Sequence, residues 1–267
     1  MQKRKNALTK KELIQKTFFP YKTGKYSEDK YPIYKKDNRT IPYNIIKPKN
    51  ESPYYILFSH GNAQSLEDIA GEIKFFCVKF GMNVVGYDYA GYGHNKSETN
   101  EENILKDIEL IYLMLIKEMK ILQENIIIMG HSMGCGPTIG LAKKICDGGL
   151  ENEGIKKGII GSVVIISGFT SCYSFFLEHY TDFEYSEDTD IFVNKKNIEG
   201  ITAPTFIAHG NDDYVIRVDN GKKLFNCIKD KNEKSELLLL DEDHISILYC
   251  GEFLNGLRKF FDKYLPK

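Results

Sequence analysis

The sequence GHSMG at residues 130–134 places Ser132 between two glycines, each two positions away. An apolar run at 125–129 comes directly before it, and a helical pattern at 133–146 follows it. A sharp strand-to-helix turn of this kind pushes the central side chain out of the backbone, and the flanking glycines avoid clashes with the adjoining strand and helix. Ser132 is therefore the candidate nucleophile.

A serine hydroxyl attacks a carbonyl only when a base takes its proton. After a turn of this kind, an acid and then a histidine are expected further along the chain. His244 follows the apolar run 236–240 and precedes the last helical pattern, so it is the candidate base. Asp212 and Asp213 both follow the preceding run at 205–209, and the spacing alone leaves either of them as the acid.

Acyl transfer also needs backbone N–H groups that hold the oxygen on which negative charge develops. Met133 begins the helix after the serine, and its amide is one candidate. Gly61 allows close backbone approach after the run 54–59, which makes the amide of Asn62 the second. The chain has neither an HExxH motif nor the Cys and His spacing of a metal site, so we expect no metal and no cofactor.

The elements that would position these residues follow from hydrophobic periodicity. Short apolar runs of the length of buried strands alternate with helical patterns, which predicts an α/β fold with a mostly parallel sheet and helices on both faces. The predicted strands are 54–59, 83–87, 125–129, 162–167, 205–209 and 236–240, and the predicted helices are 65–80, 101–120, 133–146, 219–227 and 245–264. Two further runs at 31–34 and 41–46 flank a polar turn and predict a hairpin that makes the sheet mixed. We expect a surface insertion at 147–158 and a small lid at 173–193.

Composition limits the classes of protein. The chain has 267 residues, of which 42% are hydrophobic, so one folded domain at 29–267 is expected after a basic arm at 1–28. Residues 1–50 hold 14 Lys and Arg against 4 Asp and Glu, whereas the whole chain has 36 against 37 and a net charge of −1. This distribution argues against a nucleic-acid-binding protein and permits weak peripheral contact between the arm and an anionic membrane surface; the other interpretation is a solvated tail.

The N-terminal residues and the spacing of the cysteines together predict the cellular location. The first residues contain no apolar core of a secretory signal, and the six cysteines include no CxxC pair, which is typical of free thiols in a reducing compartment. No apolar run is long enough to cross a membrane. We therefore expect a cytoplasmic protein, with the arm allowing peripheral attachment at the cytoplasmic face of membranes.

The motifs together resemble the serine α/β-hydrolase family, and most closely the α/β-hydrolase-domain group that includes cytoplasmic-face protein depalmitoylases. The matching segments, spread over about residues 30–265, are SHGNA (59–63), DYAGYG (88–93), GHSMG (130–134), FTS (169–171), APTFIAHGNDDYVI (203–216) and DHI (243–245). The resemblance implies an eight-stranded α/β-hydrolase fold with no large cap domain. It also implies that the triad is Ser132, His244 and Asp213, and not Asp212.

The resemblance further implies a hydrolase of acyl thioesters or esters, with the palmitoyl thioester of a protein cysteine as the expected substrate. General carboxylesterases, lipases and serine aminopeptidase-like hydrolases use the same residues and stay open as alternatives. A binding module that uses the fold as a scaffold without catalysis is the third alternative.

Overall fold

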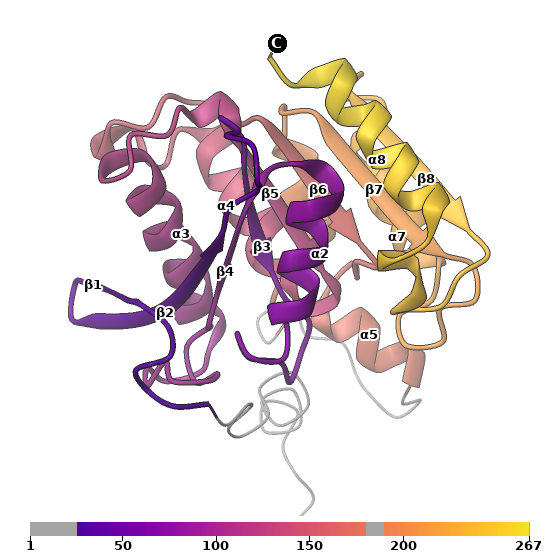
Figure 1. The fold of residues 1–267 in the computed structure, drawn as a ribbon. Coiled ribbons are helices and arrows are strands. Elements are labelled where there is room, and N and C mark those ends of the chain that lie inside the picture. The colour runs from indigo at the N-terminus through magenta and orange to yellow at the C-terminus, as the bar shows by residue number, and fades with distance from the viewer. Residues whose placement is uncertain (1–25, 180–189, 267) are drawn as a thin grey trace, which may run out of the picture.

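A computed structural model describes residues 26–179 and 190–266 (Figure 1). Eight strands form one sheet in the order β1-β2-β4-β3-β5-β6-β7-β8. The strands are β1 (Ile33–Lys36), β2 (Arg39–Ile46), β3 (Tyr55–Ser59), β4 (Asn83–Tyr87), β5 (Ile126–His131), β6 (Ser162–Ile166), β7 (Thr205–Gly210) and β8 (Ser235–Leu240). Only the pairs β1–β2 and β2–β4 are antiparallel, so the predicted mixed sheet and its hairpin are confirmed.

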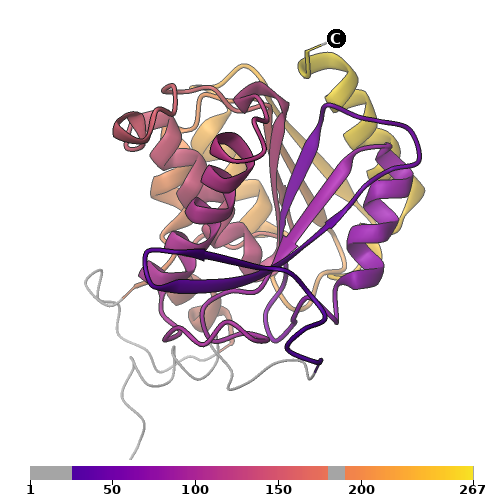
Figure 2. The same ribbon diagram turned by 60° about the vertical axis from the view of Figure 1, so that its left-hand side comes forward.

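Helices cover both faces of this sheet. They are α2 (Ala70–Phe80), α3 (Glu101–Lys117), α4 (Cys135–Asp147), α5 (Cys172–His179), α6 (Asn194–Asn197), α7 (Asp219–Ile228) and α8 (Gly251–Tyr264). One buried apolar cluster joins the sheet to α3, α4 and α7, and a second joins it to α2 and α8. Figure 2 shows the sheet between these two helix layers. The central strands are buried on both faces, which explains why their sequences are continuous apolar runs.

The predicted helices differ in their bounds from those of the structure, and two of them differ most. The helix expected to start at 65 begins at Ala70, and the chain before it forms turns in which Asp68 accepts the amide of Ser65 and Asp88 accepts the amide of Leu66, both at 2.8 Å. The expected helix 245–264 is divided into a short 3₁₀ turn, η6 (Ser246–Leu248), and α8. The side chain of Cys250 accepts the amide of Phe253 at 3.3 Å and so begins a new helix.

The predicted insertion at 147–158 contains one 3₁₀ turn, η3 (Glu151–Glu153). Of the expected lid, α5 and residues 190–193 are described. Most of the basic arm expected at 1–28 lies outside the described residues. Over 26–179 and 190–266 no separate cap domain stands over the sheet, and no helix is long and apolar enough to cross a membrane. All six cysteines are free thiols, four of them buried.

Candidate active site

Ser132 lies at the turn between β5 and α4, in the 3₁₀ turn η2 (Ser132–Gly134). Its φ of 54° is in the left-handed region, which costs a non-glycine residue free energy and aims its side chain out of the turn. A Cβ on Gly130 would come within 2.4 Å of the Gly134 carbonyl oxygen, and one on Gly134 within 2.0 Å of the Ser59 carbonyl oxygen. Both glycines are therefore required for this turn, as the spacing predicts.

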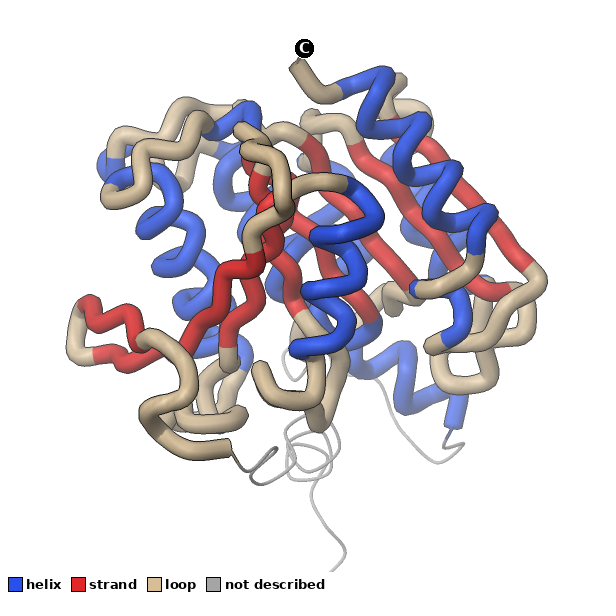
Figure 3. Tube along the Cα trace, in the orientation of Figure 1, coloured by secondary structure: helices blue, strands red, loops and turns tan. Residues whose placement is uncertain are grey.

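His244 and Asp213 reach Ser132 from the loops after the last two strands. The Ser132 hydroxyl and His244 Nε2 are 2.9 Å apart, and His244 Nδ1 and Asp213 Oδ2 are 2.7 Å apart. The loops that follow β7 and β8 lie side by side (Figure 3), with the Asp212 amide donating to the Glu242 carbonyl at 3.2 Å. The structure thus brings together three side chains that are 31 and 112 residues apart in the sequence.

Of the two candidate acids, Asp213 and not Asp212 contacts His244. The side chain of Asp213 is buried, and its Oδ1 accepts the amides of Val215 and Ile216 at 2.9 and 2.8 Å, whereas Asp212 is exposed. Burial alone would raise the pKa of Asp213, but the nearby His209 Nε2 at 3.4 Å and the hydrogen bonds from His244 and the Ile216 amide outweigh it and hold the pKa well below its usual value. The carboxylate is therefore ionised at neutral pH.

An ionised carboxylate can only accept hydrogen bonds, and this determines the tautomer of His244. The proton of the neutral ring is on Nδ1, facing Asp213, so the lone pair of Nε2 faces the hydroxyl of Ser132. In this arrangement Nε2 can take the serine proton as the oxygen attacks, and Asp213 stabilises the imidazolium that results.

Asn62 and Met133 lie beside Ser132, as expected for donors to an oxyanion. A cavity of about 90 Å³ adjoins the serine, and its walls are mostly apolar. The lining residues are Asn62, Ser132, Met133, Phe169, Phe175, Val215 and Ile216. An apolar cavity next to a nucleophile fits the carbon chain of an acyl group. The donation of the Asn62 and Met133 amides to an oxyanion stays a prediction.

Two further histidines support the acid and the base, and the sequence analysis assigned them no role. His131 Nε2–H donates to the carbonyl of His244 at 2.9 Å, and His209 Nε2–H donates to the carbonyl of Ile216 at 2.7 Å. Both are buried, and burial together with the nearby His244 lowers the pKa of His131 to about 3. Their signal was their place inside the two motifs, one residue before Ser132 and four before Asp213.

His60, at the end of β3, is also buried, and its ring stacks on Tyr89 with centroids 4.0 Å apart. Burial lowers its pKa to about 4, so this histidine is neutral at physiological pH. It contributes to packing under the loop that carries Asn62.

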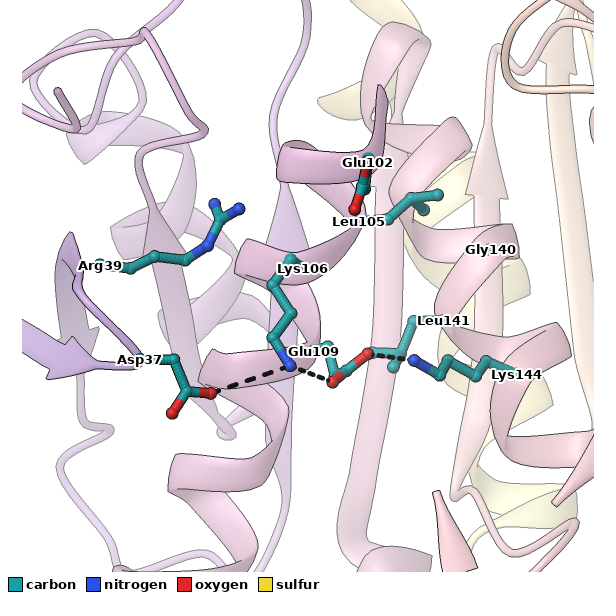
Figure 4. Close-up of a pocket in the computed structure, with 9 residues that line it drawn as sticks. All are labelled: Asp37, Arg39, Glu102, Leu105, Lys106, Glu109, Gly140, Leu141 and Lys144. Carbon is teal, nitrogen blue, oxygen red and sulfur yellow. Dashed lines mark hydrogen bonds and ion pairs between the residues drawn. The ribbon is translucent and has the colours of Figure 1, made fainter. Parts of the chain in front are cut away.

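A larger cavity of about 490 Å³ lies away from the triad, between the β1–β2 hairpin, α3 and α4 (Figure 4). Lys106 and Lys144 both pair there with the buried Glu109, at 2.8 and 2.6 Å. The three basic residues of its lining, which include Arg39, are balanced by three acidic ones, Asp37, Glu102 and Glu109, and no nucleophile with a base lines the cavity. The larger cavity therefore holds no arrangement like that of Ser132 and His244 beside the smaller one. Within the described ranges, no three His, Cys, Asp or Glu side chains are grouped so that they could hold a metal ion.

Comparison with known proteins places these features among hydrolases. The human protein named alpha/beta hydrolase domain-containing protein 17B is 30% identical over 234 residues, which cover 86% of this chain and 73% of the human protein. The 17C protein of Xenopus tropicalis is 28% identical over 216 residues, covering 80% and 64% of the two chains. No family model matches the sequence.

Solved structures with the same fold are more distant in sequence. An esterase of Pyrococcus furiosus superposes with a TM-score of 0.70 at 17% identity, covering 92% of this chain and 99% of the esterase. Mouse alpha/beta hydrolase domain-containing protein 10 superposes with a TM-score of 0.58 at 15% identity, covering 87% and 96%. At these identities the likeness concerns the fold.

Proposed function

The chain belongs to the alpha/beta hydrolase domain-containing protein 17 family, and from that premise we propose that it is a serine hydrolase that cleaves acyl thioesters and esters. The observation that carries the proposal is the continuous set of hydrogen bonds from Ser132 through His244 to Asp213. Its supports are the strained turn under the serine and the apolar cavity beside it.

In the proposed reaction, Ser132 Oγ attacks the acyl carbonyl while its proton passes to His244 Nε2. The carbonyl oxygen becomes an oxyanion that the amides of Asn62 and Met133 hold. As the tetrahedral species collapses, the bond to the leaving group breaks and His244 returns the proton to the departing thiol or alcohol. Water, deprotonated by the same histidine, then attacks the acyl-enzyme and releases the acid.

We infer that the preferred substrate is a palmitoylated protein cysteine. The family resemblance supports this substrate, and so do the apolar side chains around the serine. A cavity of about 90 Å³ is smaller than the ~300–1,000 Å³ pockets that enclose whole ligands, so only the start of a long acyl chain enters it. The remainder would cross Val215 and Tyr214, which are 48% and 84% exposed.

Activity on acyl thioesters and oxyesters of increasing chain length tests this proposal. We expect turnover of both linkages, with kcat/KM rising toward long thioesters. A preference for short oxyesters or for peptides would favour the carboxylesterase or aminopeptidase-like alternatives. If wild-type protein neither turns over any substrate nor reacts with a fluorophosphonate probe, the scaffold alternative holds.

We further propose a cytoplasmic protein that makes weak contact with membranes through its basic arm. Residues 1–20 carry six Lys and Arg against one Glu, and each basic residue near an anionic leaflet contributes about 1 kcal/mol. Deleting residues 1–20 should reduce binding to anionic vesicles at low salt and leave hydrolysis of a soluble ester unchanged. Equal vesicle binding with and without the arm would refute the proposal.

A further inference from the structure

The DYAGYG motif at 88–93 follows β4 directly, and no step of the proposed reaction uses it. Its chain turns sharply, with φ of 81° at Gly91 and 49° at Gly93. The Tyr92 amide donates to the carbonyl of Tyr89 at 2.8 Å, which closes the turn. Tyr92 is completely buried as a result, and its side chain lies under the two residues assigned to the oxyanion.

The hydroxyl of Tyr92 contacts both of those residues. It donates a hydrogen bond to Asn62 Oδ1 at 2.8 Å and lies 3.4 Å from Met133 Sδ. Asn62 comes from the loop after β3 and Met133 from the turn after β5, so one phenol joins the two segments that carry the candidate amide donors. Tyr92 is not among the residues that line the cavity at Ser132, and it would act through its neighbours.

The loop that carries Asn62 needs such support because its backbone is strained. Ala63 has a φ of 57°, in the left-handed region, and its amide donates to Asn62 Oδ1 at 2.8 Å. The side chain of Asn62 is thus folded back over its own backbone, and the Tyr92 hydroxyl holds it there. Gln64 Oε1 accepts the Gly61 amide at 2.8 Å on the other side of Asn62. These bonds hold the backbone on both sides of the Asn62 N–H.

We propose that Tyr92 is a positioning residue for the oxyanion hole, which it orients through the side chain of Asn62. The inference rests on the proposed hydrolase function and deepens it. Loss of the hydroxyl would leave the nucleophile, the base and the acid in place. The backbone amide of Asn62 would then be free to rotate away from the developing charge. The transition state would be less stabilised, whereas the bound substrate, which carries no such charge, would be unaffected.

The test is Tyr92→Phe, which removes only the hydroxyl and keeps the ring contact with Tyr89 at 5.4 Å. Removing a whole oxyanion donor costs about 10²–10³ in kcat, so loosening one should cost about 10- to 100-fold. We expect this loss in kcat on a soluble ester, with KM and the midpoint of the pH–rate profile unchanged, because the base is untouched.

Tyr87→Phe is the matched control. Tyr87 is equally buried, its hydroxyl is 2.8 Å from Ser59 Oγ, and its ring contacts Tyr89 with centroids 5.2 Å apart. Over the described residues the Tyr87 hydroxyl bonds to neither Asn62 nor Met133, so the Tm of this variant should fall by a similar amount while its kcat stays near the wild-type value. Equal kcat in the two variants, or an effect of Tyr92→Phe on KM alone, would overturn the inference.

A second test combines Asn62→Ala with Tyr92→Phe and compares the kcat of the double variant with that of each single variant. Asn62→Ala keeps the backbone amide and removes the side chain on which Tyr92 acts. The double variant should be no slower than the slower single variant, because both changes remove the same support. Multiplied losses would refute the inference. An inactive and unlabelled wild-type protein would instead refute the hydrolase proposal itself.

Discussion

Replacing Asp213 with Asn tests the tautomer of the base, because the two side chains have nearly the same shape. Asp213 Oδ1 accepts two amides, from Val215 and Ile216, and Oδ2 accepts His244 Nδ1–H at 2.7 Å. An Asn would keep its oxygen on the amides, which only donate, and so would turn its NH₂ toward the ring. His244 then accepts at Nδ1 and carries its proton on Nε2, where it cannot take the proton of Ser132.

The expected loss follows from this inverted tautomer. A triad with the wrong tautomer loses up to ~10⁴ in kcat, which equals about 5.5 kcal/mol of transition-state stabilisation. We therefore expect Asp213→Asn to lower kcat on a soluble ester by about 10³- to 10⁴-fold, with KM little changed. The rate of fluorophosphonate labelling should fall in parallel, since labelling needs the same proton transfer.

Asp212→Asn is the control, because this neighbour is exposed and meets the β8 loop through its backbone amide. Its kcat should stay within about twofold of the wild-type value, the range of surface substitutions. Both variants are assayed below their Tm, since Asp213 also bonds to the fold around it. Equal losses in the two variants, or a larger loss in Asp212→Asn, would show that the acid is assigned to the wrong residue.

Three further predictions concern the turn and a buried acid. Ser132→Ala should abolish fluorophosphonate labelling, and persistent labelling would place the nucleophile elsewhere. The free energy of unfolding of Ser132→Gly should be about 1 kcal/mol higher than that of Ser132→Ala, because glycine accepts the positive φ without strain. Gly134→Ala should lower the free energy of unfolding, measured in urea, by about 3 kcal/mol or more, since the added Cβ would lie 2.0 Å from a carbonyl oxygen of β3. A free energy of unfolding equal to that of the wild type would contradict this close approach. Burial raises the pKa of Asp88 from 3.8 to about 6. Its protonated form is thus favoured by folding, and stability present below pH 3.8 is lost as pH rises through 6. At 1.36 kcal/mol per pH unit, the unfolding free energy of the wild type relative to Asp88→Asn should fall by roughly 2 kcal/mol between pH 4 and 7, and a constant difference would refute the shift.

The triad could be predicted from sequence because each member follows a strand in a local pattern. Ser132 stands between glycines that the turn requires, and the base and acid follow the last two strands in the expected order. The choice of Asp213 over Asp212 needed more than spacing, and the structure distinguishes them by burial.

Contacts between distant segments could not be predicted in this way. The bond from His131 to the carbonyl of His244 joins residues 113 positions apart, and that from Tyr92 to Asn62 joins residues 30 apart. Neither depends on periodicity or turn chemistry, so no local pattern signals it. The break before α8 escaped prediction for a related reason, since a cysteine side chain is an unusual acceptor at the start of a helix.

The buried histidines make the whole fold sensitive to acid. The unfolded chain takes up protons on His131 and His60 near pH 6.5, whereas the folded chain does so only at about 3 and 4. Stability is therefore complete above pH 6.5 and is lost as pH falls toward those values. The buried Asp88 acts in the opposite direction, because folding favours its protonated form, and so it offsets part of this loss as pH falls from 6 toward 3.8.

An acidic compartment would therefore weaken the fold around His131 and His60, next to the segments that carry Ser132 and Asn62. Such a molecule persists where the surroundings are held near neutrality, which accords with the cytoplasmic location proposed above.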